Sequence, residues 1–301
     1  MGTALLAWVF GLRHAVDADH IAAIDNVVRK LMRDGQRPAT AGLFFALGHS
    51  TVVVIASCVT ATAGDRLAEI KDYGGTIGTL VSAVFLLLIA LINLVILRGV
   101  WRGFRHLAAG GTPIAESSNA LTAGGGFLAR LYRPLLRSIA KPSHMYPIGF
   151  LFGLGFDTAT EVGLLGISAT QAAHGLPPGH TLVFPALFTA GMVLIDTLDS
   201  ALMVEAYGWA FLQPMRKMWY NLTMTAASVV VAVLIGGLEA LGLLSGRLGF
   251  EGRFWTAVSD LNADLTNFGF LVVAVFALSL VLSVLLYRWR GYDRLEHESH
   301  P

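Results

Sequence analysis

Seven long apolar stretches constrain the fold of this 301-residue sequence more than any other feature. A helix needs about 20 residues to cross about 30 Å of hydrocarbon. A backbone in lipid must also satisfy its own hydrogen bonds, so each stretch is expected to be helical. The predicted spans are 1–28, 40–63, 76–98, 146–172, 181–205, 219–245 and 267–288. The sequence therefore predicts an all-α, multi-pass membrane bundle that forms a single domain over residues 1–301.

The composition excludes several other classes of protein. Hydrophobic residues make up 55% of the chain and charged residues only 14%, whereas soluble domains carry about 25% charged residues. A net charge of +1 gives no basic field for nucleic acid. The single cysteine excludes a disulfide scaffold and a multi-thiolate metal site. There is no GxxxxGK[ST] motif, so neither an ATPase of its own nor an ATPase subunit is indicated. The expected partner is the lipid bilayer.

The positions of Lys and Arg predict the orientation in the membrane. Sixteen of the 21 basic residues lie in the connections on one side of the predicted spans, and four lie on the other side. Basic residues gather in cytoplasmic loops. The chain is therefore expected in the cytoplasmic membrane, the inner membrane of a two-membrane cell. Its C-terminus and the long loop 99–145 should be cytoplasmic, and its N-terminus should be outside.

Acidic residues inside the predicted spans are the main functional signal. Nine lie there, namely Asp17, Asp19, Asp25, Asp157, Glu161, Asp196, Asp199, Glu205 and Glu239. Arg13 is the one basic residue assigned to the spans, with Arg29 counted in the following loop. Burying each charge costs about 3 kcal/mol, so the carboxylates require protons or metal ions. Histidines in the same spans favour a borderline divalent metal over Mg²⁺ or Ca²⁺.

The densest group is Arg13-His14-Ala15-Val16-Asp17-Ala18-Asp19-His20-Ile21. On a continuous helix, His14, Asp17 and His20 would share one face and could offer three ligands to one ion. Asp19 would face a neighbouring helix, support the ligands from behind, or be recruited by a local kink. The alternative interpretation is a polar helix end at the membrane interface. Asp25, Asn26, Glu205 and Glu239, near span ends, are expected to be exposed.

His49 lies in the second span within Gly48-His49-Ser50. Two interpretations stay open: a packing residue in an apolar helix, or a further metal ligand. Gly48 is expected to allow close approach of another helix, and so is the pair Gly149 and Gly153.

Two carboxylate pairs are expected to share helix faces and to line a transport path beside Thr158. Asp157 and Glu161 are four residues apart, and Asp196 and Asp199 are three residues apart. Like charges so close must either differ in protonation or bind a cation between them. Protonated carboxyls that bond neighbouring helices are the alternative.

Four sequence blocks together resemble the nickel/cobalt transporter family. They are RHAVDADHI at 13–21, GHSTV at 48–52, LGFDTATE at 154–161 and GMVLIDTLD at 191–199. The resemblance implies a secondary transporter, a permease that imports Ni²⁺ and/or Co²⁺ as substrate rather than cofactor. It implies that His14, Asp17, Asp19 and His20 bind or select the metal. Members of that family usually have eight spans and carry the first block in the second one, so one helix is expected to be missing here. A true start upstream is favoured over a fragment and over a member that works without that helix.

Three alternatives differ from metal import. An efflux carrier would favour a His-rich cytoplasmic segment, whereas loop 99–145 contains only His106 and His144. An intramembrane metal-dependent hydrolase would need HExxH or a comparable motif, and none is present, so no enzyme is expected. A proton-coupled carrier of an organic solute would explain the carboxylates but not the paired histidines.

Overall fold

A computed structural model of the chain describes residues 2–62, 67–108, 139–155, 158–210, 214–263 and 265–289. These residues form helices joined by turns, and none of them lies in a β-strand. In chain order the elements are α1 (Gly2–His14), α2 (Ala18–Arg33), α3 (Ala41–Thr62), α4 (Leu67–Ala108), η2 (Pro142–His144), α7 (Met145–Phe152), α8 (Ala159–Ala173), α9 (Pro178–Thr181), α10 (Val183–Ala210), α11 (Pro214–Leu248), α12 (Arg253–Ala263) and α13 (Leu265–Trp289).

Five of the predicted spans are long apolar helices, as expected. The segments long and apolar enough to cross a membrane are Ala41–Thr62, Gly75–Arg102, Gly179–Gly208, Trp219–Leu248 and Phe268–Leu286. They match the predicted spans 40–63, 76–98, 181–205, 219–245 and 267–288. Two of the helices extend well beyond the prediction, since α4 has 42 residues and α11 has 35. The chain is therefore an all-α protein with several candidate membrane-spanning helices.

The other two predicted spans, 1–28 and 146–172, are each divided into two shorter helices, so the prediction of continuous helices there is wrong. In the first, α1 ends at His14 and α2 begins at Ala18. The backbone of Asp17 between them is extended, with φ −65° and ψ 145°. In the second, α7 ends at Phe152 and α8 begins at Ala159, after an equally extended Thr158.

Each interruption packs against a glycine of a long helix. A Cβ atom at Gly269 of α13 would collide with the carbonyl oxygen of Val16, in the first interruption. A Cβ atom at Gly78 of α4 would collide with the backbone of Gly155, in the second. Bare glycine backbone thus makes room for non-helical chain inside the bundle, where irregular backbone is tolerated only if protein or a cavity surrounds it.

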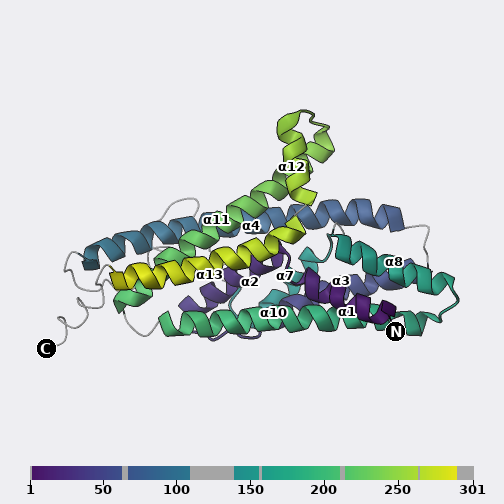
Figure 1. Cartoon of the computed structure of the whole chain (residues 1–301), viewed down its shortest axis with the longest axis horizontal. Helices are drawn as coiled ribbons and strands as arrows, with labels where there is room; N and C mark the ends of the chain where they lie inside the picture. Colours follow the sequence, from purple (N-terminus) through teal and green to yellow (C-terminus); the bar gives the residue numbers. More distant parts are fainter. Residues whose placement is uncertain are drawn as a thin grey trace.

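Long helices run beside both divided pairs. The helix α10 contacts α1 and α2, and α3 contacts α7 and α8 (Figure 1). The α3–α7 contact is made at backbone distance, because a Cβ atom at Gly48 would meet the carbonyl of Tyr146 and one at Gly149 would meet that of Phe45. The expected close packing at Gly48, Gly149 and Gly153 is confirmed.

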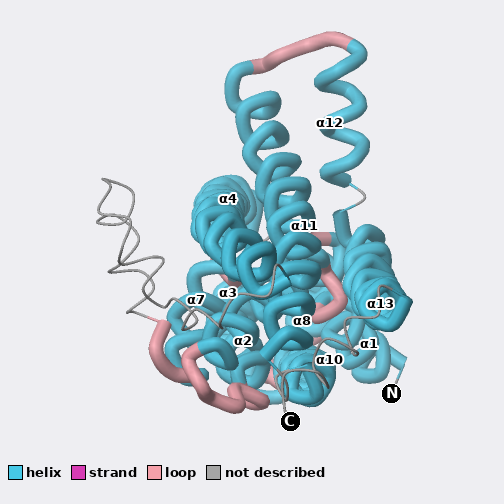
Figure 2. The backbone as a smooth tube through the Cα atoms, turned by 90° about the vertical axis from the view of Figure 1, so that its left-hand side faces the viewer, coloured by secondary structure: helices cyan, strands magenta, loops and turns pink. Residues whose placement is uncertain are grey.

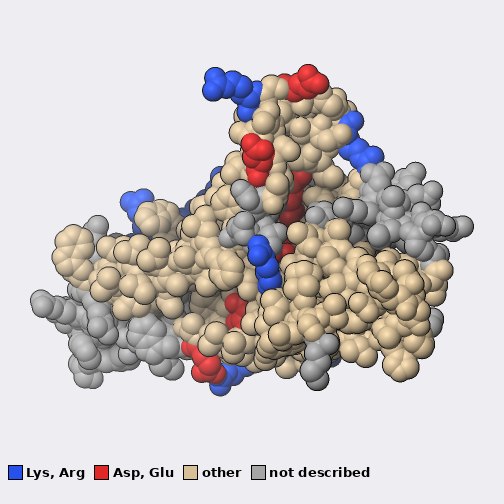
Figure 3. All heavy atoms as spheres, turned by 45° about the vertical axis from the view of Figure 1, so that its right-hand side comes forward, with Lys and Arg blue, Asp and Glu red and all other residues tan. Residues whose placement is uncertain are grey.

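The remaining long helices form a second group, in which α11 contacts both α4 and α13. Beyond this contact, α11 turns back into α12, and the two helices project together as a hairpin (Figure 2). Large apolar side chains on the long helices face outward, as at Leu198, Leu234 and Phe270, which are 50%, 59% and 63% exposed. Much of the surface in Figure 3 carries no charged side chain. Such a surface suits a bilayer, whose chains accept apolar groups.

The predicted long loop 99–145 begins as helix, because α4 continues to Ala108. Residues 109–138 lie outside the described part of the chain. The chain re-enters it at Ile139, which is buried, and leads through η2 into α7.

Candidate functional site

Three buried imidazoles meet where the divided helices face each other. His14 ends α1, His20 lies in the first turn of α2, and His49 lies in the middle of α3. Their ring centroids are 4.7 Å apart for His14 and His20, and 4.8 Å apart for each of the other two pairs. All three side chains are at most 2% exposed. Residues separated by 35 positions in the chain thus form one cluster, here called the histidine cluster (His14, His20 and His49).

Each imidazole has a carboxylate beside it. The Nδ1 atom of His14 lies 2.9 Å from Oδ2 of Asp17. The Nε2 atom of His49 lies 2.9 Å from Oε1 of Glu161, which is 3.7 Å from Nε2 of His14. The third pair is looser, with Nδ1 of His20 at 3.4 Å from Oδ2 of Asp196.

Two threonines complete one side of the cluster. The hydroxyls of Thr158 and Thr160 lie 3.4 Å and 3.3 Å from Nδ1 of His14. Thr158 also donates a hydrogen bond to Oε2 of Glu161, at 3.0 Å, and its hydroxyl accepts one from the Glu161 backbone N–H at the start of α8. The side chain that caps α8 therefore also holds the carboxylate of Glu161 toward the histidines.

The helix interruptions account for this arrangement. On a continuous helix, Asp17 and His20 would lie progressively farther from His14 along the helix axis. The turn at 15–17 instead brings both side chains close to the His14 ring. The prediction of one continuous helix that presents these ligands on a single face is therefore wrong. A break is present, but Asp19, the residue that a kink could have recruited, does not meet the rings. Apolar rings close the cluster: Phe45 packs edge-on against His20 at 4.8 Å between centroids, and Phe188 lies 5.5 Å from His14.

Most of the residues predicted to form a site meet here. The gathered ones are His14, Asp17, His20, His49, Thr158, Glu161 and Asp196. Asp19 is half-buried, and its carboxylate accepts a hydrogen bond from the backbone N–H of His20 instead of meeting the rings. Asp199 lies one turn further along α10. Asp157 lies outside the described residues.

Other polar residues were expected at the surface and are not there. Asp25 and Asn26 are 0% and 3% exposed, and Asp25 pairs with Arg29 of the same helix, at 3.1 Å. Arg29, which the sequence pattern places in the following loop, lies in α2. Its spacing of four residues from Asp25 is the sequence feature that could have predicted their ion pair. Arg13, assigned to the membrane interior, is exposed.

The two glutamates near span ends differ. Glu239 is only 6% exposed and accepts a hydrogen bond from Ser82, so its predicted exposure is wrong. Glu205 is exposed as predicted, in an ion pair with Arg37 at 2.6 Å.

Two of the imidazole nitrogens are as close together as two ligands of one metal ion would be. Nε2 of His14 and Nε2 of His49 are 3.0 Å apart. Two nitrogens that each lie about 2.0–2.1 Å from one ion at a right angle would be separated by about 3 Å. Among the described residues, Nε2 of His20 and Oδ1 of Asp196 are buried without a hydrogen-bond partner. Buried polar atoms are normally satisfied, so these atoms suit a site whose partner is a ligand.

Comparison with known proteins identifies the family. Residues 1–286 match the NicO family, described as high-affinity nickel-transport protein. The chain is 59% identical over 293 residues to a hydrogenase nickel incorporation protein, HupN, of Bradyrhizobium diazoefficiens, covering 96% of this chain and 76% of the relative.

Further relatives carry transport names. A high-affinity nickel transport protein of Cupriavidus necator is 55% identical over 300 residues, covering 98% of this chain and 86% of the relative. A cobalt transport protein, NhlF, of Rhodococcus rhodochrous is 38% identical over 285 residues, covering 92% and 80%. No solved structure matches. This chain is a transporter rather than an enzyme, and it belongs to the high-affinity nickel-transport family.

Proposed function

We propose that this protein imports Ni²⁺, Co²⁺ or both across the cytoplasmic membrane, and that the histidine cluster binds the ion during transport. The observation that carries the proposal is the meeting of three buried imidazoles with Asp17, Glu161 and Asp196 at two helix interruptions. In transporters, interrupted helices commonly form the substrate and ion sites.

The chemistry of the donors suits these ions. Imidazole is a good ligand for nickel, cobalt, zinc and copper, whereas Mg²⁺ and Ca²⁺ prefer oxygen. Asp17 and Asp196 approach Nδ1 of His14 and of His20, which leaves Nε2 of each ring for the ion. A carboxylate on the second ring nitrogen orients a metal-binding histidine and raises its basicity. In this assignment Asp17 and Asp196 hold His14 and His20, while Glu161 shares the centre with Nε2 of His49.

Other predicted site residues take places around this centre. Asp19 adds negative charge one residue before His20. Thr158 directly precedes α8, and Asp196 and Asp199 follow one another along α10. Asp157, outside the described residues, is assigned to the same path from its place in the sequence. Together they form the path along which the ion enters and leaves the cluster.

The divided helices each complete a crossing in this proposal. The pair α1 and α2 lies along α10, and the pair α7 and α8 lies along α3, so each pair crosses the bilayer once. With the five continuous spans, this gives seven crossings. The distribution of Lys and Arg then places the C-terminus in the cytoplasm.

Import is favoured over the alternatives. The relatives named above are nickel or cobalt transport and incorporation proteins. The segment 99–145 carries only two histidines, which does not favour efflux. A carrier of organic solutes would have no use for three converging imidazoles.

Uptake of radiolabelled Ni²⁺ and Co²⁺ by cells that express the chain tests the proposal. We expect accumulation at limiting metal, stronger competition between Ni²⁺ and Co²⁺ than from Mg²⁺, and loss of uptake in His14→Ala. The matched control is His174→Ala, because His174 is exposed at the end of α8. Depletion of cellular metal would indicate efflux instead. Equal uptake by the two variants would refute the role of the cluster.

A further inference from the structure

A second buried polar group lies along α2, beyond the histidine cluster. It joins four helices, and its members are Asp25, Asn26 and Arg29 of α2, Asn93 of α4, Tyr207 of α10, and Thr225 and Ser228 of α11. None of these side chains is more than 5% exposed. We call this group the inner network. It lies toward the end of α2 that carries Lys30 and Arg33.

Asp25 and Arg29 form the centre of the inner network. Asp25 accepts hydrogen bonds from Arg29 Nε at 3.1 Å, from the Tyr207 hydroxyl at 2.7 Å and from the Ser228 hydroxyl. Arg29 also donates to Thr225 at 3.3 Å and to the side-chain oxygen of Asn26 at 3.4 Å. Replacing a buried ion pair by apolar side chains is often neutral or stabilising, so stability alone gives little reason to keep this one.

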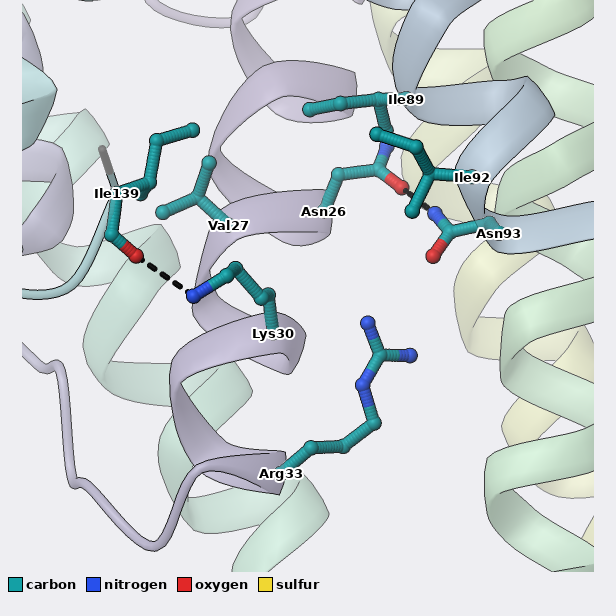
Figure 4. Close-up of a pocket in the computed structure, with 8 residues that line it drawn as sticks. All are labelled: Asn26, Val27, Lys30, Arg33, Ile89, Ile92, Asn93 and Ile139. Atoms are coloured by element: carbon teal, nitrogen blue, oxygen red, sulfur yellow. Dashed lines mark hydrogen bonds between the residues drawn. The ribbon is translucent and has the colours of Figure 1, made fainter. Parts of the chain in front are cut away.

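Along α2, His20, the inner network and the lining of a pocket follow one another in that order. Asn26 and Asn93, hydrogen-bonded to each other, line the pocket, and Lys30 and Arg33 reach it from the last turns of α2 (Figure 4). On the other side of the network, His20 lies five residues before Asp25 on the same helix. An ion that moves along α2 from the cluster toward the basic end of this helix would meet the network on its way.

Two carboxylates of α10 lie between the histidine cluster and Tyr207 of the inner network along the chain. Asp196 contacts His20, and Asp199 follows one turn later on α10. On α10, Tyr207, whose hydroxyl donates to Asp25, lies about two helical turns beyond Asp199. One carboxylate oxygen of Asp199 is buried without a hydrogen-bond partner among the described residues. Asp196 and Asp199 thus lead along α10 from His20 toward Tyr207 and Asp25, and Asp25 is paired with Arg29.

We propose that the Asp25–Arg29 pair is the inner gate of the transport path, with the Arg29 guanidinium acting as a tethered cation that holds Asp25 until a metal ion displaces it. The inference rests on the transport function proposed above and adds where the path is closed. With Arg29 on Asp25, the network ties α2 to α4, α10 and α11 and closes the route to the pocket. A divalent ion that reaches Asp199 repels the guanidinium and competes for Asp25. The ties then loosen, and the ion leaves toward the pocket.

The gate is tested by the accessibility of a single cysteine at Ala22. This residue is fully buried on α2 between His20 and Asp25, and packs near Tyr207 and Met224. In a Cys58→Ser background, which removes the one native cysteine, Ala22→Cys is exposed to a membrane-impermeant thiol reagent in inside-out vesicles. Thr40→Cys, at an exposed residue, reports access of the reagent to the same face. The labelling rate of each cysteine is measured with and without Ni²⁺. Each measurement is made in the Cys58→Ser background and in the same background with the double substitution Asp25→Asn/Arg29→Gln.

The expected labelling rates differ between these proteins. Without metal, Ala22→Cys is labelled slowly, and Ni²⁺ raises its rate about tenfold or more, as when a minor conformation becomes dominant. The Asp25→Asn/Arg29→Gln variant is labelled at the fast rate without metal, and its Ni²⁺ uptake falls. Thr40→Cys is labelled at one rate throughout. A second variant, Arg29→Lys, keeps the charge but loses the three-way contact of the guanidinium, and an intermediate rate is expected.

The gate is refuted if Ni²⁺ leaves the labelling of Ala22→Cys unchanged. It is also refuted if both network variants are labelled as slowly as the background and take up Ni²⁺ at its rate. Equilibrium binding of Ni²⁺ to the purified proteins distinguishes failure of the gate from failure of the proposed metal-binding function. Binding by the network variants at the background affinity shows that they fold and keep the histidine cluster. A background protein that binds no Ni²⁺ would overturn the proposed function instead.

Discussion

At the scale of single residues, the side chains around the histidine cluster divide by what they touch. His14 and His49 bring Nε2 atoms to within 3.0 Å of each other, whereas Asp17 lies on the opposite nitrogen of His14. A residue that supplies a ligand and a residue that orients one should therefore respond differently to substitution. The sequence could not separate these roles, because both residue types are common metal ligands and their spacing fits either role.

Removal of one imidazole should abolish tight binding. We expect His14→Ala, His20→Ala and His49→Ala each to weaken Ni²⁺ binding to the purified protein at least about 100-fold, more than the 10–100-fold typical of losing an outer-shell partner. Isothermal titration calorimetry measures this, with His174→Ala as the control expected to bind like the wild type. Unchanged affinity in any one of the three would remove that histidine from the site.

Asp17→Asn should have a smaller effect. The amide preserves the size of the side chain but not the charge that orients His14, so we expect affinity to fall about 10–100-fold. Retention of the Ni²⁺ coordination spectrum of the wild type would accompany this loss. A loss as large as that of His14→Ala, together with a changed spectrum, would instead make Asp17 a direct ligand.

At the scale of elements, the sequence predicted which segments are apolar but not where two of them break. The residues Ala15 and Val16 carry no helix-breaking signal, and Asp17 was expected within a helix. Gly269, 253 residues beyond Val16 in the chain, lies against the break, and its bare backbone makes room for the carbonyl group of Val16. Such a contact is decided by tertiary packing, which sequence periodicity does not report. The burial of Asp25 and Arg29 escaped prediction for the same reason, since their partners Tyr207 and Ser228 come from distant helices.

The close packing of α3 on α7 predicts an unusual sensitivity to one methyl group. Gly48→Ala would place a Cβ atom against the carbonyl of Tyr146 and displace His49 next to it, at a cost of about 1–3 kcal/mol. A Cβ atom at Gly166 of α8 would meet no atom within 4 Å beyond the backbone of its own helix, so Gly166→Ala should leave the stability of the protein unchanged or raise it slightly. Thermal unfolding in detergent and Ni²⁺ binding measure both effects. Equal melting temperatures for the two variants would contradict the packing described here.

At the scale of the whole molecule, the proposed seven crossings determine which ends face the cytoplasm. A reporter fused after Arg294 is expected to be cytoplasmic and one inserted after Gly175 external, because the connections richest in Lys and Arg should lie inside. Paired alkaline phosphatase and green fluorescent protein fusions report the two sides independently. Both reporters on one side would show that a divided pair does not cross.

The central claim is that the transported ion binds to imidazoles contributed by α1, α2 and α3 together. X-ray absorption spectroscopy of the Ni²⁺-loaded, purified protein tests this most directly, because imidazole rings give a characteristic multiple-scattering signal. We predict three imidazoles per bound ion and no sulfur, with one imidazole fewer for any of His14→Ala, His20→Ala or His49→Ala measured at saturating metal. A bound ion surrounded only by oxygen, with no imidazole scattering in the wild type, would contradict the account.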